Sequence, residues 1–229
     1  MNARLRFGLI LGLVSAIGAA TACGDGTSTE ALTLKSFHRL KTDKDGCSYE
    51  SEHGAVMGHY DVGLAAQGGG EFAVYLRLVN NLESNEDLDS GRLDTNRVKV
   101  DRVEIEFDRA APWGFLPEKI DVPTGVVVDT AEEYFVPIGA VTQEVAALIN
   151  ERGDVFAKGP VRMRFKAKAF GELFDGTAAE SNDLSFGIEV CRNCYGTPCP
   201  GMKVQALCSS WAQPDGWSCV EPDDPAEGA

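Results

Sequence analysis

Hydrophobic and polar residues alternate along several stretches of the chain, which is the pattern of β-strands with one face buried. The clearest stretch is residues 161–170, where apolar residues take every second position and basic residues take the others. Residues 71–79 alternate in the same way, and residues 183–190 supply an antiparallel partner for 161–170. Weaker patterns predict short strands at residues 60–65, 126–128 and 134–138.

One predicted strand, residues 97–108, changes its phase midway. Its apolar positions are even up to Val100 and odd from Val103 onward. A β-bulge near Asp101 and Arg102 would turn both halves toward the same core.

Only one segment has helical spacing. Val145, Leu148 and Ile149 recur at that spacing, with Thr142 as a candidate N-cap and Gly153 as the stop. Several alternating strands, frequent turn signals and this one short crossover helix predict an all-β fold, an antiparallel β-sandwich.

The first 23 residues have the parts of an export signal. Arg4 and Arg6 make a positive start, residues 7–19 are apolar, and Ala20-Thr21-Ala22 precede Cys23. The apolar run is shorter than the roughly 20 residues that cross a bilayer. We therefore expect a mature protein that begins at Cys23 and lies outside the cytoplasm.

A cysteine directly after such a signal resembles the lipobox of bacterial lipoproteins. The resemblance implies that fatty acids such as palmitate are attached to Cys23 and anchor the chain to a membrane. Ala20-Thr21-Ala22 also fits an ordinary secretory signal, which would be cut at the same bond without the lipid. The cysteine count favours the anchor, because lipidation of Cys23 leaves an even set of six among the seven cysteines.

Length and charge limit the remaining possibilities. Removing residues 1–22 leaves 207 of the 229 residues, which suits one β domain with appendages or two small domains. The signal holds two of the 21 basic residues and no acidic one, so 19 basic residues face 35 acidic ones and the mature charge is -16. Such a surface repels nucleic acid, so we expect no nucleic-acid partner.

The pattern divides the chain into four parts. We expect a signal peptide at 1–22, a flexible tether at 23–46, the sandwich at 47–190, and a cysteine-rich tail with a disordered end at 191–229. The tail cysteines could bind zinc or an iron-sulfur cluster, but an exported chain favours disulfides. Five tail cysteines cannot all pair among themselves, so Cys47 should pair with one of them; the predicted disulfide cysteines are Cys47, Cys191, Cys194, Cys199, Cys208 and Cys219.

Four short motifs give the body a resemblance of its own. They are Val79-Asn80-Asn81-Leu82, Thr95-Asn96-Arg97-Val98, Glu180-Ser181-Asn182 and Val190-Cys191-x-x-Cys194. In this combination the chain resembles uncharacterised cell-envelope lipoproteins of myxobacteria and their relatives. The resemblance implies an immunoglobulin-like body, a cysteine-rich tail and an outer-membrane location, and it implies no catalytic residue.

Basic residues form a stripe on one face of the strand at 161–170: Arg162, Arg164, Lys166 and Lys168. The stripe could bind an anionic sugar, a lipid head group or an acidic protein. Alternatively, Glu104 and Glu106 on a neighbouring strand could pair with it across the sheet, and we favour this interpretation.

Two histidines and an aspartate, His53, His59 and Asp61, are weak candidates for a zinc or copper site. Their spacing matches no common metal motif, so we expect neither a metal nor any other cofactor. The acidic loop at 81–92 lacks the ligand order of a calcium loop, and His38 in the predicted tether should be solvated.

No common catalytic motif occurs in the chain. The sequence therefore favours a non-enzymatic envelope lipoprotein that acts as a structural or binding module, with an envelope protein or polysaccharide as its partner. The alternative is a metal carrier or a hydrolytic enzyme of the periplasm or cell surface.

Overall fold

The computed structural model describes residues 31–43, 46–49, 53–66, 70–87, 89–194, 203–206 and 217–220. No helix within these ranges is long and apolar enough to cross a membrane. Cys23 and the signal lie outside the described residues, so the lipid anchor stays a prediction.

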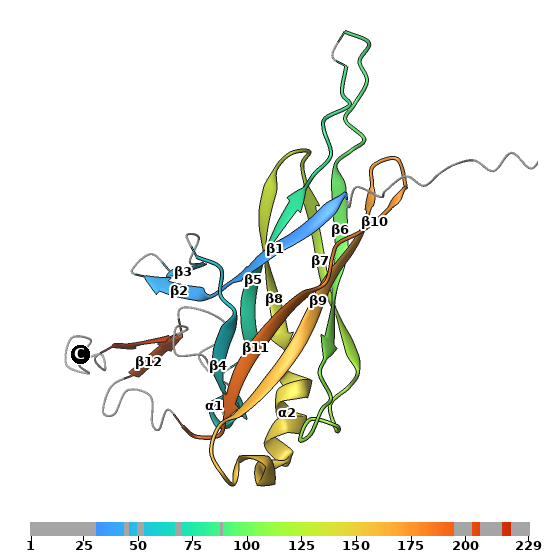
Figure 1. The fold of residues 1–229 in the computed structure, drawn as a ribbon. Coiled ribbons are helices and arrows are strands. Elements are labelled where there is room, and N and C mark those ends of the chain that lie inside the picture. Colours follow the sequence, from blue (N-terminus) through green and yellow to red (C-terminus); the bar gives the residue numbers. More distant parts are fainter. Residues whose placement is uncertain are drawn as a thin grey trace, which may run out of the picture.

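Two sheets lie face to face (Figure 1). The smaller sheet has the order β1-β5-β8, formed by Leu32–His38, Phe72–Asn80 and Glu133–Val141. The larger sheet has the order β4-β11-β9-β6-β7, formed by Met57–Asp61, Leu184–Cys191, Val161–Leu173, Val98–Phe107 and Lys119–Val128, and β10 (Ala178–Glu180) pairs with β9. Two separate hairpins are β2–β3 (Leu40–Asp43, Gly46–Tyr49) and β12–β13 (Lys203–Ala206, Trp217–Val220).

The strand order is that of an immunoglobulin-like sandwich. The smaller sheet corresponds to strands A-B-E and the run β11-β9-β6-β7 to strands G-F-C-C′ of that fold. The all-β prediction is therefore confirmed. One pairing differs from a purely antiparallel sandwich, because β4 lies parallel to β11 at the sheet edge.

The sandwich begins earlier than the sequence predicted. β1 lies within the expected tether, yet Leu32 is 0% and Leu34 is 2% exposed, and the strand pairs with β5. His38, expected in solvent, is 1% exposed and packs edge-on against Phe135. The hydrophobic alternation of β1 is weak in the sequence because a bulge between Leu34 and Ser36 shifts its register.

The predicted bulge in β6 is confirmed. The register with both β7 and β9 shifts between Val100 and Arg102, and the apolar residues on either side of the shift are buried. On β9 the bulge faces Gly171, where a Cβ atom would lie 2.1 Å from the Lys99 carbonyl oxygen. Only glycine allows this close approach of the two backbones.

The predicted helix is α2 (Gln143–Glu151), which connects β8 of the smaller sheet to β9 of the larger one. The Thr142 hydroxyl caps it by accepting a hydrogen bond from the Val145 amide at 3.4 Å. Val145 and Ile149 are buried as expected, but Leu148 is 39% exposed and Ala146 takes the inner face in its place. A 3-10 helix, Gly153–Phe156, follows directly. A short helical turn, α1 (Val62–Leu64), follows β4.

Phenylalanines join the two sheets in the core. Phe37 of the smaller sheet lies 5.6 Å from Phe165 and 4.7 Å from Phe186 of the larger sheet, measured between ring centroids. Phe72 of β5 lies 6.1 Å from Phe186. These rings support the larger sheet from beneath, on the side opposite its outer face.

The motif residues that carry the family resemblance hold the fold together. Asn80, which is 0% exposed, ends β5 and donates hydrogen bonds to the carbonyl oxygens of Asn96 (2.8 Å) and Val128 (3.2 Å). Its own side-chain oxygen accepts a hydrogen bond from the Leu82 amide at 3.1 Å. One buried amide thus connects the smaller sheet to the segment just before β6 and to the end of β7.

A second asparagine, Asn182, connects β1 to the segment before β11 through its side chain. The Asn182 side chain accepts a hydrogen bond from the Leu34 amide at 2.8 Å and donates one to the Leu34 carbonyl at 3.2 Å. Its neighbour Ser181 accepts a hydrogen bond from the Ala169 amide at 2.9 Å. These side chains satisfy backbone groups that the sheet ladders leave open.

The segment from Asn81 to Arg97 projects beyond the sheets as a long arm (Figure 1). Asn85 fixes the base of the arm. Its side-chain amide donates a hydrogen bond to the Thr95 hydroxyl at 2.8 Å, and its side-chain oxygen accepts one from the Thr95 backbone amide at 2.8 Å. Asp94 accepts a hydrogen bond from the Thr130 hydroxyl at 2.7 Å. The carboxylate therefore holds the arm to the loop after β7.

Candidate binding site

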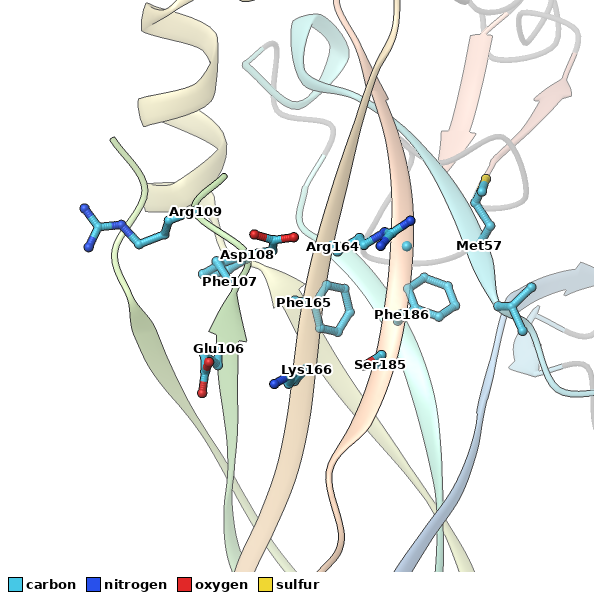
Figure 2. Close-up of a pocket in the computed structure, with 12 residues that line it drawn as sticks. Met57, Glu106, Phe107, Asp108, Arg109, Arg164, Phe165, Lys166, Ser185 and Phe186 are labelled. Atoms are coloured by element: carbon cyan, nitrogen blue, oxygen red, sulfur yellow. The ribbon is translucent and has the colours of Figure 1, made fainter. Parts of the chain in front are cut away.

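A groove of about 660 Å³ crosses the outer face of the larger sheet (Figure 2). It runs over β6, β9 and β11 to the start of β4. The lining residues come from these strands and the loop after β6: Val56, Met57, Glu106, Phe107, Asp108, Arg109, Arg164, Phe165, Lys166, Ser185, Phe186 and Gly187.

Small residues on β11 create the hollow. Ser185 pairs with Lys166, and Gly187 pairs with Arg164 on one side and Met57 on the other. Long side chains on β9 and β4 therefore flank two positions with little or no side chain. Phe165 and Phe186 beneath them are 1% and 2% exposed, so the floor is a packed core.

Two rows of side chains cross the strands in the groove. Glu106, Lys166 and Ser185 occupy paired positions in one row, and Asp108 lies beside Arg164 in the other, where the Asp108 amide bonds the Arg164 carbonyl at 2.9 Å (Figure 2). Each row passes from a carboxylate to a cation and then to a small residue. From β6 to β11 the groove thus presents carboxylates, then cations, then small residues, and Val56 and Met57 add an apolar edge near the start of β4.

The loop after β6 forms one wall and is fixed by two hydrogen bonds. The Trp113 indole donates to the Arg162 carbonyl at 2.7 Å, and Trp113 is 3% exposed. The Arg109 guanidinium donates to the Gly114 carbonyl at 2.7 Å. This wall is therefore held in position before any ligand arrives.

The basic stripe divides into paired and unpaired cations. Lys168 lies opposite Glu104 and bonds Glu180 at 2.6 Å, and this hydrogen bond raises the pKa of Lys168. Lys119 bonds Glu104 at 2.8 Å, which raises the pKa of Lys119. Glu104 and Glu106, the partners expected from the sequence, lie opposite Lys168 and Lys166 but form their ion pairs with Lys119. Pairing with a neighbouring strand thus accounts for Lys168 alone, and its partner is Glu180.

The other three cations of the stripe remain available. Within the described ranges, no carboxylate lies within 4.0 Å of the charged groups of Arg162, Arg164 or Lys166. Of these three, Arg164 and Lys166 line the groove. Arg162, Arg164 and Lys166 are exposed, so the groove cations are open to a ligand from solvent.

The structure does not bring the side chains of His53, His59 and Asp61 together. His59 is half-buried and its Nδ1 lies 3.7 Å from Glu189, whereas His53 is exposed. Asp61 is 0% exposed, and its Oδ1 accepts hydrogen bonds from the backbone amides of Gly63 (2.9 Å) and Leu64 (3.3 Å). In the described part of the chain, no metal-sized group of ligands includes either histidine.

The tail cysteines are described in part. Cys191 and Cys194 form a disulfide. The sequence predicted disulfide bonding for both residues but left their partners open. The side chains of Cys47, Cys199, Cys208 and Cys219 lie outside the described residues. Their pairing, including the bridge from Cys47 to the tail, stays a prediction.

The sequence predicted Arg164 and Lys166 as candidate binding residues but not the other residues that line the groove. Ser185 and Gly187 occupy alternate outward positions of a predicted strand, and two small residues there are the signal that a hollow exists. Nothing in the sequence placed Met57 beside them, because that depends on the parallel pairing of β4.

No protein-family description matches this chain, and a search of curated proteins found no similar protein. The geometry of the groove is therefore the basis for a functional proposal.

Proposed function

We propose that this chain is a non-enzymatic lipoprotein, anchored to the outer membrane through Cys23, that binds an acidic polysaccharide of the cell envelope in the groove. The observation that carries the proposal is the placement of Arg164 and Lys166 on the walls of the hollow over Ser185 and Gly187. Neither cation forms an ion pair with another described residue. The protein is otherwise strongly acidic, so a cationic site is a local exception.

The mixed charge of the groove favours a sugar over a more highly charged ligand. Arg164 and Lys166 can hold a carboxylate, while Glu106 and Asp108 can accept hydrogen bonds from hydroxyl groups. The same two acids would repel a ligand with a charge at every position. Met57 and Val56, which is 83% exposed, provide an apolar edge for the carbon face of a sugar ring.

Binding should depend on Arg164 and Lys166. A hyaluronan oligosaccharide, in which carboxylated and uncharged sugars alternate, should bind the mature protein. The double substitution Arg164→Ala/Lys166→Ala should weaken this binding by about a hundredfold or more, since charge-assisted hydrogen bonds contribute roughly 1.5–3 kcal/mol each. Isothermal titration calorimetry measures the change.

The matched control is Arg162→Ala, which removes an exposed cation of the same strand outside the groove and should leave the affinity unchanged. Ser185→Trp should block binding by filling the hollow. Equal binding of a neutral oligosaccharide of the same length, or full affinity in the double variant, would refute the groove as an acidic-sugar site.

The anchor has its own test. Protein extracted from native membranes with detergent should begin at Cys23 and carry the added mass of two or three fatty acids, and Cys23→Ala should move it to the soluble fraction, because the acyl chains contribute about 0.8 kcal/mol per buried methylene. Intact mass spectrometry gives the result. An unlipidated chain starting at Cys23 would indicate ordinary secretion.

A further inference from the structure

Three metal-ligating side chains meet where the larger sheet ends. The ligand atoms of Asp61, Cys191 and Cys194 all lie within 4.8 Å of one another. Asp61 and Cys191 are 0% and 4% exposed, whereas Cys194 is exposed to solvent. The two sulfur atoms are joined in a disulfide.

The fold fixes the carboxylate independently of the sulfur atoms. Cys191 pairs with Asp61 in the parallel register of β11 and β4. Asp61 Oδ1 also accepts a hydrogen bond at 2.8 Å from the amide of Asn193, which lies between the two cysteines. Gly63 lets this loop approach, since a Cβ atom there would lie 2.0 Å from the Asn193 side-chain oxygen. The donors to Asp61 Oδ1 from Gly63, Leu64 and Asn193 are backbone amides, so breaking the disulfide removes none of these groups.

Charge decides what this cluster can bind. In the disulfide the sulfur atoms carry no charge. After reduction, two thiolates and a carboxylate held close together by the same backbone would repel one another. A divalent cation offsets that repulsion, and two thiolates with one carboxylate form a ligand set that suits zinc, with a fourth position left for water.

We propose that Asp61, Cys191 and Cys194 form a binding site for a zinc-type divalent cation that opens when the disulfide is reduced. An external dithiol is the reductant. Its first thiolate attacks the exposed Sγ of Cys194, the bond to Cys191 breaks, and Cys191 leaves as a thiolate. The second thiol then displaces Cys194, so the dithiol loses two electrons as its own disulfide and the protein gains them. Zinc replaces the protons of the two thiols on binding.

This site also predicts a coupling between zinc and the disulfide. Because the cation binds only the reduced pair, free zinc shifts the equilibrium toward reduction by a factor that grows with the ratio of the zinc concentration to its dissociation constant. Zinc should therefore increase the reduced fraction of Cys191 and Cys194.

The test uses the full mature chain, reduced without oxygen by a phosphine that is then removed. Alkylation rates at each cysteine, followed by peptide mass spectrometry, should fall at Cys191 and Cys194 when zinc is added. Asp61→Asn keeps the oxygen that the three amides bond but removes the charge, and it should raise the zinc concentration needed for protection by about tenfold or more. Cys194→Ser should remove the protection of Cys191, whereas Cys199→Ser should leave it intact.

Three outcomes would overturn the proposal. Zinc could leave the alkylation of Cys191 and Cys194 unchanged, or protect them equally in the wild type and Asp61→Asn. The third is loss of the β-sheet circular dichroism spectrum on reduction with zinc present, because the site would then not exist in the reduced protein.

Discussion

A variant that lacks Glu104 should fail to fold, whereas a variant that lacks Asp101 in the same strand should keep its fold. Both deletions shorten β6 by one residue. They differ in what they do to the alternation of inward and outward side chains, since Asp101 lies at the bulge and Glu104 lies in the regular half of the strand.

Deleting Glu104 leaves β6 two arrangements, and each buries a charge. If the bulge stays, Ile105 and Phe107 turn outward and Glu106 turns into the core. If the bulge is lost, Arg102 enters the core in place of Val103, which is 0% exposed. An unpaired buried charge costs several kcal/mol, which is comparable to the roughly 5–15 kcal/mol stability of a whole domain.

Deleting Asp101 has the opposite effect. Val100 and Arg102 pair with Gly171 and Phe170, which are neighbours on β9, so removal of the residue between them gives a regular ladder on that side. All apolar residues of β6 then alternate without interruption. The deletion weakens the pairing with β7, whose bulge must widen, and it removes the exposed ion pair of Asp101 with Lys99. Together we expect these two losses to lower the free energy of unfolding by about 1–2 kcal/mol.

Urea denaturation of the two deletion variants, followed by circular dichroism, compares them with the wild type. The expected result is a cooperative transition for the Asp101 deletion and none for the Glu104 deletion. Equal damage from both would show that the bulge itself, with its effect on strand twist, is required for the fold.

The second large effect is expected at Asn80. Asn80→Ala should destabilise the fold by about 3 kcal/mol, since it breaks three hydrogen bonds and leaves backbone groups of Asn96, Val128 and Leu82 without that partner. Asn80→Asp should be at least as damaging, because a carboxylate oxygen would face the two carbonyl oxygens that the amide group now bonds.

Asn81→Ala is the matched control, because it changes the adjacent residue of the same type. Asn81 is exposed and its side chain donates to the Thr33 hydroxyl at 2.6 Å, so we expect a loss below about 1 kcal/mol. Chemical denaturation of the three variants gives the free energies of unfolding. Similar values for Asn80→Ala and Asn81→Ala would contradict the sheet-joining role of Asn80.

Several asparagines of the short sequence motifs have structural roles. Asn80, Asn96 and Asn182 join strands or fix the arm, and Asn193 lies in the turn that Asp61 holds. None of them lines the groove. These motif residues therefore contribute to how the sandwich is built and not to the lining of the groove.

The sequence by itself determined the strands whose two faces differ. Phe72 to Asn80 and Met163 to Ala169 alternate because one face meets the core and the other meets water, and this contrast can be read locally. The β6 bulge was equally readable, since its phase change leaves two consecutive exposed residues, Asp101 and Arg102. The cap of α2 depends only on Thr142 and the turn that follows it.

The tertiary structure alone decided the elements whose neighbours lie far away in the chain. β7 is longer than predicted because its residues at the sheet edge are mostly exposed or half-buried, so the pattern is weak. β1 joined the core through pairing with β5, and β4 brought Met57 to Gly187 and Asp61 to Cys191. Both the groove and the cysteine cluster arise from that parallel pairing, which links residues about 130 positions apart. A local pattern cannot encode such a contact, because strand partners are selected by the packing of the whole sandwich.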